Sequence, residues 1–153
     1  MASVQTRYEI DTEDVEYLRH GAKPLLMRLF KPHGKGPFPL VVDVHGGAWC
    51  RGDRTDDTPL NEPLAKTGVV VAALDFRQPP DGGYPEAQAD INYPTRWPKP
   101  AASDLGARPD RVGVMGISSG GQQAMMGAFR HADRRYASLP LEGKPNIDAK
   151  VQC

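Results

Sequence analysis

The sequence predicts an α/β fold, with a mostly parallel sheet flanked by helices. Three apolar, β-branched runs have the composition of buried strands: residues 40–47, 69–76 and 110–117. Each is followed by a stretch with helical signals: residues 58–68, 84–93 and 119–131. Because strands that alternate with helices pair in parallel and carry helices on both faces, this order favours a parallel sheet covered on both sides.

The N-terminal part is predicted to add an antiparallel hairpin to this sheet. Residues 15–20 and 25–30 are short strand-like runs, and the Gly-Ala-Lys-Pro sequence between them is a turn signal. Residues 148–153 have the pattern of a further strand. We therefore expect a hairpin before the parallel strands and the start of another strand after them.

The helical segments carry start and stop signals of different quality. In residues 58–68, Thr58 is a candidate N-cap, Pro59 falls in the first turn, and Gly68 closes the helix. The helix that begins at Glu86 is followed by three prolines, Pro94, Pro98 and Pro100. Since each interior proline costs a helix about 3 kcal/mol, we expect this helix to end or kink near Tyr93.

Composition limits the classes of function. The 153 residues have the size of one domain, and we expect residues 1–153 to form a single domain. The 19 basic and 19 acidic side chains cancel, which gives no electrostatic reason to bind nucleic acid or an anionic membrane. The polar N-terminus, the lack of a long apolar stretch and the two cysteines favour a soluble, cytoplasmic protein. We expect Cys50 to be an ordinary buried cysteine.

The corner after the third apolar run carries the first candidate for chemistry. Gly116-Ile117-Ser118-Ser119-Gly120 fits the pattern G-x-S-x-G, in which a serine is held on a strained strand-to-helix turn with its hydroxyl exposed. The N–H groups that start the next helix favour developing negative charge. A plain tight turn is the alternative, whereas a dinucleotide site is disfavoured because the glycine spacing differs from G-x-G-x-x-G.

A second glycine corner, residues 45–53, follows the first apolar run. The sequence His-Gly-Gly-Ala-Trp lets backbone N–H groups approach a ligand oxygen without interference from Cβ atoms. Alone it would be read as an ordinary glycine turn. Because it precedes the serine corner in the order that a nucleophile motif requires, it indicates an oxyanion-binding loop.

Residues 37–54, 69–91 and 111–125 together resemble the N-terminal half of an α/β-hydrolase. The match is best to the esterase and lipase group with an H-G-G-[GA]-W loop, which includes hormone-sensitive-lipase-like carboxylesterases and acetylxylan- or feruloyl-esterase-like domains. The resemblance implies that Ser118 is the nucleophile. It also implies that the oxyanion site is formed by Gly46, Gly47, Ala48 and Ser119, with Gly46 permitting the turn. Asp75 and Arg77 are expected to be structural.

The general base that a serine nucleophile needs is missing from this pattern. The resemblance implies an acid and then a histidine after Ser118, but the only later histidine, His131, precedes Asp133, Glu142 and Asp148. His131 falls roughly 20 Å along the predicted helix, too far to act as a base. His45 is nearer and is a candidate surrogate base, although the resemblance gives it a supporting role in the loop.

The sequence thus predicts a serine carboxylesterase-type hydrolase for small esters whose acid and histidine are not in this chain. The resemblance implies that further strands, the acid and the histidine normally follow the position of Cys153, so it predicts a truncated domain. Such a domain has an uncovered sheet edge, which favours self-association or a complementing C-terminal part. The alternative is a catalytically inactive remnant or association module. We expect no cofactor and no metal, since no Cys/His cluster has ligand spacing.

Overall fold

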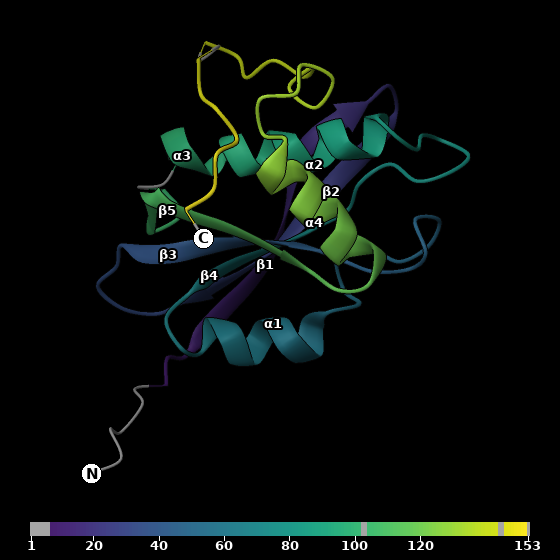
Figure 1. The fold of residues 1–153 in the computed structure, drawn as a ribbon. Helices are drawn as coiled ribbons and strands as arrows, with labels where there is room; N and C mark the ends of the chain where they lie inside the picture. Colours follow the sequence, from purple (N-terminus) through teal and green to yellow (C-terminus); the bar gives the residue numbers. More distant parts are fainter. Residues whose placement is uncertain (1–6, 102–103, 144–145, 153) are drawn as a thin grey trace.

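The computed structural model describes residues 7–101, 104–143 and 146–152. Its centre is a five-stranded sheet with the strand order β1-β2-β4-β3-β5 (Figure 1). The strands are β1 (Ile10–His20), β2 (Lys23–Pro32), β3 (Phe38–Val44), β4 (Val70–Leu74) and β5 (Ala107–Gly116). The predicted α/β class, with an antiparallel hairpin before parallel strands, is confirmed.

The hairpin β1-β2 forms one edge of the sheet, and β2 also pairs antiparallel with β4. The turn between the strands is short, with Gly21 at φ +59°. Both strands extend beyond the predicted runs. The added residues of β1 are mostly polar and exposed, so backbone pairing rather than burial holds them in the sheet.

Strands β4, β3 and β5 are parallel, with β3 in the middle. Their carboxyl ends meet at one edge of the sheet, where α/β proteins bind their ligands. The side chains of β3 alternate between the faces: Val42 and Val44 lie in the large core, while Asp43 points to the other side.

The helices cover both faces of the sheet, as predicted (Figure 1). Helix α1 (Thr58–Ala65) lies on one face, where Ala65 packs in a cluster with Phe30 and Val71. Helices α2 (Glu86–Arg96), α3 (Pro98–Ala101) and α4 (Ser119–Phe129) lie on the other. Asp57, rather than the predicted Thr58, is the N-cap residue of α1, because Thr58 is already helical and its hydroxyl donates to the Thr55 carbonyl at 2.7 Å.

The prediction that the helix from Glu86 ends or kinks near Tyr93 is wrong about its end, because α2 runs through Pro94 to Arg96. Pro94 cannot donate to the carbonyl of Asp90, one turn earlier. The hydroxyl of the buried Tyr17 lies 3.4 Å from that carbonyl oxygen, so the freed acceptor still faces a polar group. Tertiary packing of α2 thus overrides the local cost. Pro98 begins the separate helix α3, where its missing N–H is harmless.

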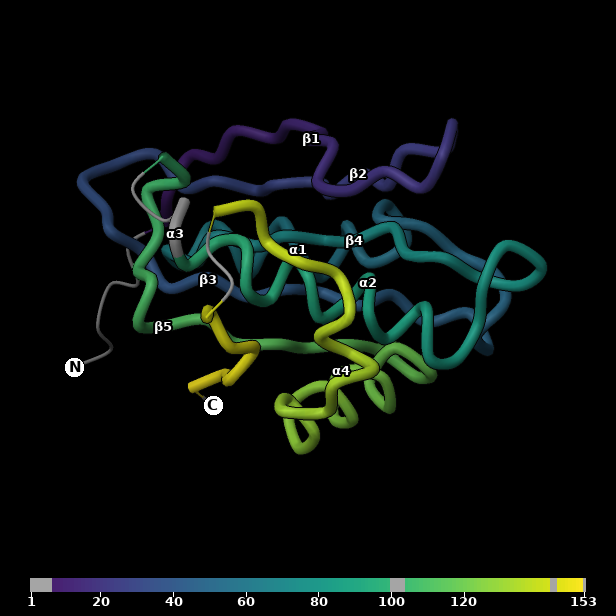
Figure 2. The backbone as a smooth tube through the Cα atoms, turned by 90° about the horizontal axis from the view of Figure 1, so that it is seen from above, coloured from purple at the N-terminus to yellow at the C-terminus, as the bar shows by residue number. Residues whose placement is uncertain are grey.

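The last described residues run along the outer edge of β5 (Figure 2). The Gln152 amide donates to the Val112 carbonyl at 3.0 Å, and Ala149 is buried. The predicted strand at 148–153 is not formed within 148–152, and Cys153 lies outside the described residues. Within the described ranges, none of the helices has the length and apolar character needed to cross a bilayer.

Candidate active site

A sharp turn joins β5 to α4, and Ser118 lies at its centre. Ser118 has φ +54° and ψ −120°, a conformation that side-chain-bearing residues rarely adopt. A Cβ added to Gly116 would lie 2.5 Å from the carbonyl carbon of Gly120, and one added to Gly120 would lie 1.9 Å from the carbonyl oxygen of Val44. Close backbone packing therefore requires both glycines, as the motif spacing predicts.

The hydroxyl of Ser118 is available for chemistry. The residue is exposed, and among the described residues none forms a hydrogen bond with its side chain. Its carbonyl oxygen accepts a hydrogen bond from the Gln122 amide at 3.3 Å, in the first turn of α4. Because C=O and N–H of one trans peptide point in opposite directions, the Ser119 N–H points out of the helix N-terminus.

The glycine loop, residues 46–53, leaves the end of β3 and lies against this turn. A Cβ on Gly46 would be 3.1 Å from the Ile117 carbonyl oxygen and 3.4 Å from the Cβ of Ser118. The Trp49 amide donates to Ser119 Oγ at 3.3 Å, and the Trp49 indole donates to Gln122 Oε1 at 3.1 Å. The two predicted corners, distant in sequence, are therefore in contact.

The carbonyl groups of the glycine loop are held by hydrogen bonds. His45 Nδ1 lies 2.6 Å from the Gly46 carbonyl oxygen and must donate, because a carbonyl only accepts. The Gly47 carbonyl accepts from the amides of Cys50 and Arg51, both at 3.2 Å. In a trans peptide the C=O and the N–H point in opposite directions. With their carbonyls fixed, the Gly47 N–H therefore points away from the Gly46 carbonyl, and the Ala48 N–H points away from the Gly47 carbonyl.

Three amides are thus free to bind an anion beside Ser118. Within the described part of the chain, no acceptor takes a hydrogen bond from the N–H groups of Gly47, Ala48 or Ser119. Gly46 contributes differently from these three: its carbonyl receives the His45 bond, and its missing side chain permits the close approach to Ser118. This arrangement is chemically suited to hold an oxyanion that forms on a carbonyl attacked by Ser118.

His45 supports the glycine loop and is not placed as a base for Ser118. The ring is buried and stacked on Phe76, with centroids 4.4 Å apart. Its Nδ1 is occupied by the Gly46 carbonyl, and its buried Nε2 has no partner among the described residues. His45 therefore makes no contact with Ser118 that would support the alternative role of a surrogate base.

The other three histidines are bound elsewhere, and all four lie in described residues. His131 Nδ1 lies 3.2 Å from the Ala128 carbonyl oxygen, at the end of α4 opposite to Ser118. His20 pairs with Asp90 at 2.8 Å, and His33 with Asp11 at 2.9 Å. Ser118 is therefore an exposed serine without a histidine base in hydrogen-bond contact.

A buried carboxyl lies near the end of β3 and faces helix α1. Asp43 of β3 is 1% exposed, and its Oδ2 accepts from Asn61 of α1 at 2.7 Å, while its Oδ1 has no partner in the described residues. Burial, with a smaller contribution from the nearby Asp57, raises the pKa of Asp43 to about 6. Its neighbour Asp57 also has a pKa raised by burial.

Three side chains that hold the glycine loop or the residue after it were not anticipated from the sequence. Arg54 binds Asp75 and Asp14, Gln78 binds the Gly52 carbonyl, and Gln122 binds the Trp49 indole. No local sequence pattern marks them, because their partners are far away in the chain. Cys50 also departs from expectation: it is exposed rather than buried, because the turn at Gly47 directs it outward. Arg77, which is expected to be structural, binds the buried Asp90.

One cavity adjoins the Ser118 turn, and a second lies beside Trp49 of the glycine loop. The larger, about 890 Å³, lies along α4 and the end of β5 and is lined by Ser118, Met125 and Phe129 among others. The smaller, about 420 Å³, lies between Trp49, Tyr84 and Met126. The described residues contain no cluster of three or more His, Cys, Asp or Glu side chains arranged to hold a metal ion.

This chain is similar in sequence to known ester hydrolases. A family model described as BD-FAE matches residues 27–152. Carboxylic ester hydrolase LipN from Mycobacterium tuberculosis is 38% identical over 116 residues, covering 74% of this chain and 31% of that protein. Versiconal hemiacetal acetate esterase from Dothistroma septosporum is 33% identical over 116 residues, covering 74% of this chain and 35% of that protein. The chain thus spans about a third of the length of these curated relatives.

The fold is also found among solved structures. Esterase 2 of Thermogutta terrifontis in its apo form superposes with a TM-score of 0.80 at 23% identity. The match covers 92% of this chain and 52% of that one. At this identity the likeness shows the fold, and the chemistry of the site must be argued from the residues themselves.

Proposed function

This chain belongs to the BD-FAE family of α/β-hydrolases, and from that premise we propose that it carries the nucleophile and the oxyanion site of a carboxylic ester hydrolase. The observation that carries the proposal is the set of three unoccupied amides, at Gly47, Ala48 and Ser119, in the loop and the helix start that adjoin the exposed Ser118. Its substrates are small carboxylic esters, which the exposed hydroxyl can reach.

The reaction begins when Ser118 Oγ attacks the ester carbonyl carbon. A bond forms between Oγ and that carbon, the carbonyl π electrons move onto oxygen, and the hydroxyl proton passes to a base. The amides of Gly47, Ala48 and Ser119 hold the resulting oxyanion. As it collapses, the bond to the alcohol oxygen breaks and the alcohol takes the proton. Water then releases the acid from Ser118 by the same steps.

The base is proposed to come from polypeptide outside this chain. None of the four histidines forms a hydrogen bond with Ser118. Without a base, the oxyanion site and substrate binding alone leave roughly 10³–10⁴-fold catalysis over water, and this remainder does not need the serine. We therefore expect slow ester hydrolysis by the chain alone, with a Ser118-dependent part that grows as rising pH ionises the hydroxyl.

Hydrolysis of p-nitrophenyl acetate by the purified chain tests this proposal. Ser118→Ala is expected to remove the part of the activity that rises with pH and to leave the remainder, while Ser138→Ala, at an exposed serine beyond α4, serves as the matched control and should retain both parts. The rate should rise steadily with pH, without the inflection that a histidine base near pH 6.5 would introduce. Equal turnover by the Ser118→Ala variant would refute Ser118 as the nucleophile.

We further propose that the isolated chain self-associates through the outer face of α4. Phe129 is 79% exposed and Met125 is 59% exposed, and both line the larger cavity. Contiguous exposed apolar surface of this kind favours association. In sedimentation velocity, Phe129→Glu should shift the chain toward monomer. Leu60→Glu, at an exposed apolar residue on α1, should not. A wild-type chain that stays monomeric at high micromolar concentration would contradict the proposal.

A further inference from the structure

The glycine loop holds an unusual concentration of strained backbone. Four of its residues have left-handed φ angles: Gly47 at +114°, Ala48 at +54°, Trp49 at +64° and Gly52 at +101°. Ala48 and Trp49 have side chains and therefore bear a steric cost in this region. Such conformations persist only where the surrounding structure holds them. The question is which contacts do so at the two ends of the loop.

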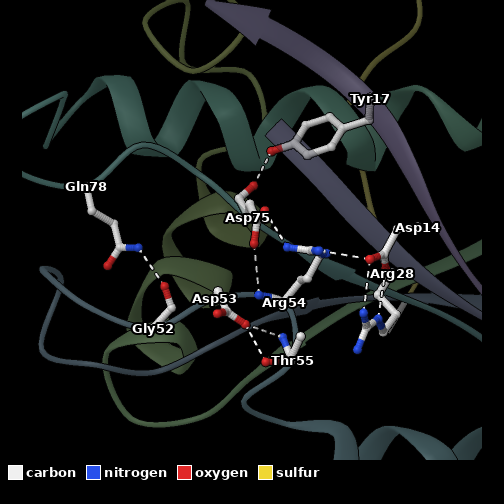
Figure 3. A network of polar contacts seen from close by, with 9 residues as sticks. All are labelled: Asp14, Tyr17, Arg28, Gly52, Asp53, Arg54, Thr55, Asp75 and Gln78. Carbon is white, nitrogen blue, oxygen red and sulfur yellow. Dashed lines mark hydrogen bonds and ion pairs between the residues drawn. The ribbon is translucent and has the colours of Figure 1, made fainter. Parts of the chain in front are cut away.

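The start of the loop is held by β3 and by His45, whereas its end is held by Arg54. The Arg54 amide donates to Asp75 Oδ1 at 2.9 Å, and its Nη1 donates to Asp75 Oδ2 at 3.0 Å (Figure 3). Both oxygens of one carboxylate thus bind the backbone and the side chain of the same residue. This pair fixes the position of the chain directly after the loop.

Asp75 is itself held firmly at the end of β4. Its amide donates to the Leu26 carbonyl at 2.8 Å, and the buried Tyr17 hydroxyl donates to the Asp75 carbonyl at 2.5 Å (Figure 3). Tyr17 lies at the register shift between Glu16 and Leu18 of β1, which directs it into the core. The carboxylate that receives Arg54 is therefore attached to three strands of the sheet.

The second guanidinium nitrogen of Arg54 extends this contact to the hairpin. Nη2 donates to Asp14 Oδ2 at 2.8 Å, and Asp14 is also bound by Arg28 through Nε at 2.8 Å and Nη2 at 3.0 Å (Figure 3). Arg28 and Arg54 together hold the pKa of Asp14 well below its usual range, so it stays ionised. Gln78 adds one bond to the loop, from its Nε2 to the Gly52 carbonyl at 3.0 Å.

We propose that Arg54 is a positioning residue that sets the direction of the Gly47 and Ala48 amides by fixing the end of the glycine loop to Asp75 and Asp14. This inference rests on the proposed esterase function for its catalytic meaning. Arginine is required because two nitrogens of one planar group must reach two carboxylates at once. A lysine in its place delivers a single charge to one of them.

Arg28 provides a matched control for Arg54. Both guanidinium groups bind Asp14, but within the described part of the chain Arg28 forms no hydrogen bond with the loop or with Asp75, and only the charge of Asp53 acts on it from the loop. Arg54→Met and Arg28→Met should therefore lower the melting temperature to a similar extent. Only Arg54→Met should change the NMR amide signals of Gly47 and Ala48 and the indole signal of Trp49. Arg54→Lys should shift these signals part of the way.

Two further measurements separate this proposal from the esterase proposal. In ester hydrolysis, Arg54→Met should lower kcat about 10- to 100-fold with KM nearly unchanged, because an oxyanion donor acts in the transition state. The NMR comparison is repeated in the Ser118→Ala background, where no chemistry occurs, so it decides the positioning role even if no variant hydrolyses esters. Asp75→Asn, which keeps the shape of Asp75, is used if Arg54→Met does not fold. Loop signals that move equally in the Arg54 and Arg28 variants would overturn the proposal.

Discussion

The two corners that form the site are built in different ways. At the β5 corner a single residue, Ser118, is strained, and contacts of Gly116 and Gly120 with nearby backbone hold it there. At the β3 corner, four residues have left-handed φ angles, and side chains from other elements hold the loop. The first corner is specified by glycine spacing. The second depends on groups that lie far apart in the sequence.

The largest effect should come from breaking the backbone packing of the β5 corner. Gly120→Ala places a methyl group 1.9 Å from the Val44 carbonyl oxygen, so β3 and α4 must separate. We expect a loss of more than about 3 kcal/mol in the free energy of unfolding, measured by urea denaturation. Gly83→Ala is the control, because its added Cβ would meet only Pro79 at 4.0 Å. A loss below 1 kcal/mol for Gly120→Ala would show that this corner is not held by close packing.

A smaller, pH-dependent effect should distinguish the β3 corner. The pKa of Asp43 is about 6 in the folded chain against an ordinary value of 3.8, so the unfolded state loses this proton more readily. Its contribution to stability is therefore present below pH 4 and is lost as the pH rises through about 6, by roughly 3 kcal/mol. The β5 corner, residues 116–120, contains no titratable side chain and should not respond.

Asp43→Asn tests this difference. Above pH 6 the variant should be more stable than the wild type by about 2–3 kcal/mol, because it removes a buried carboxylate, and the gap should close near pH 4. Asp110→Asn is the control. The hydrogen bond from the exposed Arg108 lowers the pKa of the Asp110 carboxyl, so this substitution should change stability only at acid pH. Urea unfolding at pH 4, 6 and 8 measures both variants. A gap that stays constant with pH would show that Asp43 does not titrate in this range.

The same contrast explains what could be predicted from the sequence. The parallel strands, the hairpin and the faces of the helices follow from apolar periodicity and turn residues, which are local. The turn at Ser118 follows from glycine spacing, because its constraint is backbone packing within a few residues and β3. The path of α2 through Pro94 could not be predicted, because the Tyr17 hydroxyl near the freed carbonyl comes from the distant strand β1.

The glycine loop marks the limit of such prediction. His-Gly-Gly-Ala-Trp indicates an oxyanion loop, but nothing local shows that Arg54 joins it to Asp75 and Asp14. The exposure of Cys50 also depends on the path of the loop, which the composition of the segment does not determine. Residues that act through partners on other strands become visible only when the sheet is assembled.

The most direct test of the central claim is to react the chain with a fluorophosphonate and locate the adduct by mass spectrometry. The account predicts phosphonylation of Ser118, because it proposes that the exposed hydroxyl attacks and that the amides of Gly47, Ala48 and Ser119, which have no acceptor among the described residues, stabilise a tetrahedral adduct. The adduct should disappear in Ser118→Ala and persist in Ser138→Ala. An adduct on another residue, or no adduct even at high pH and long exposure, would contradict the assignment of this corner as a nucleophile site.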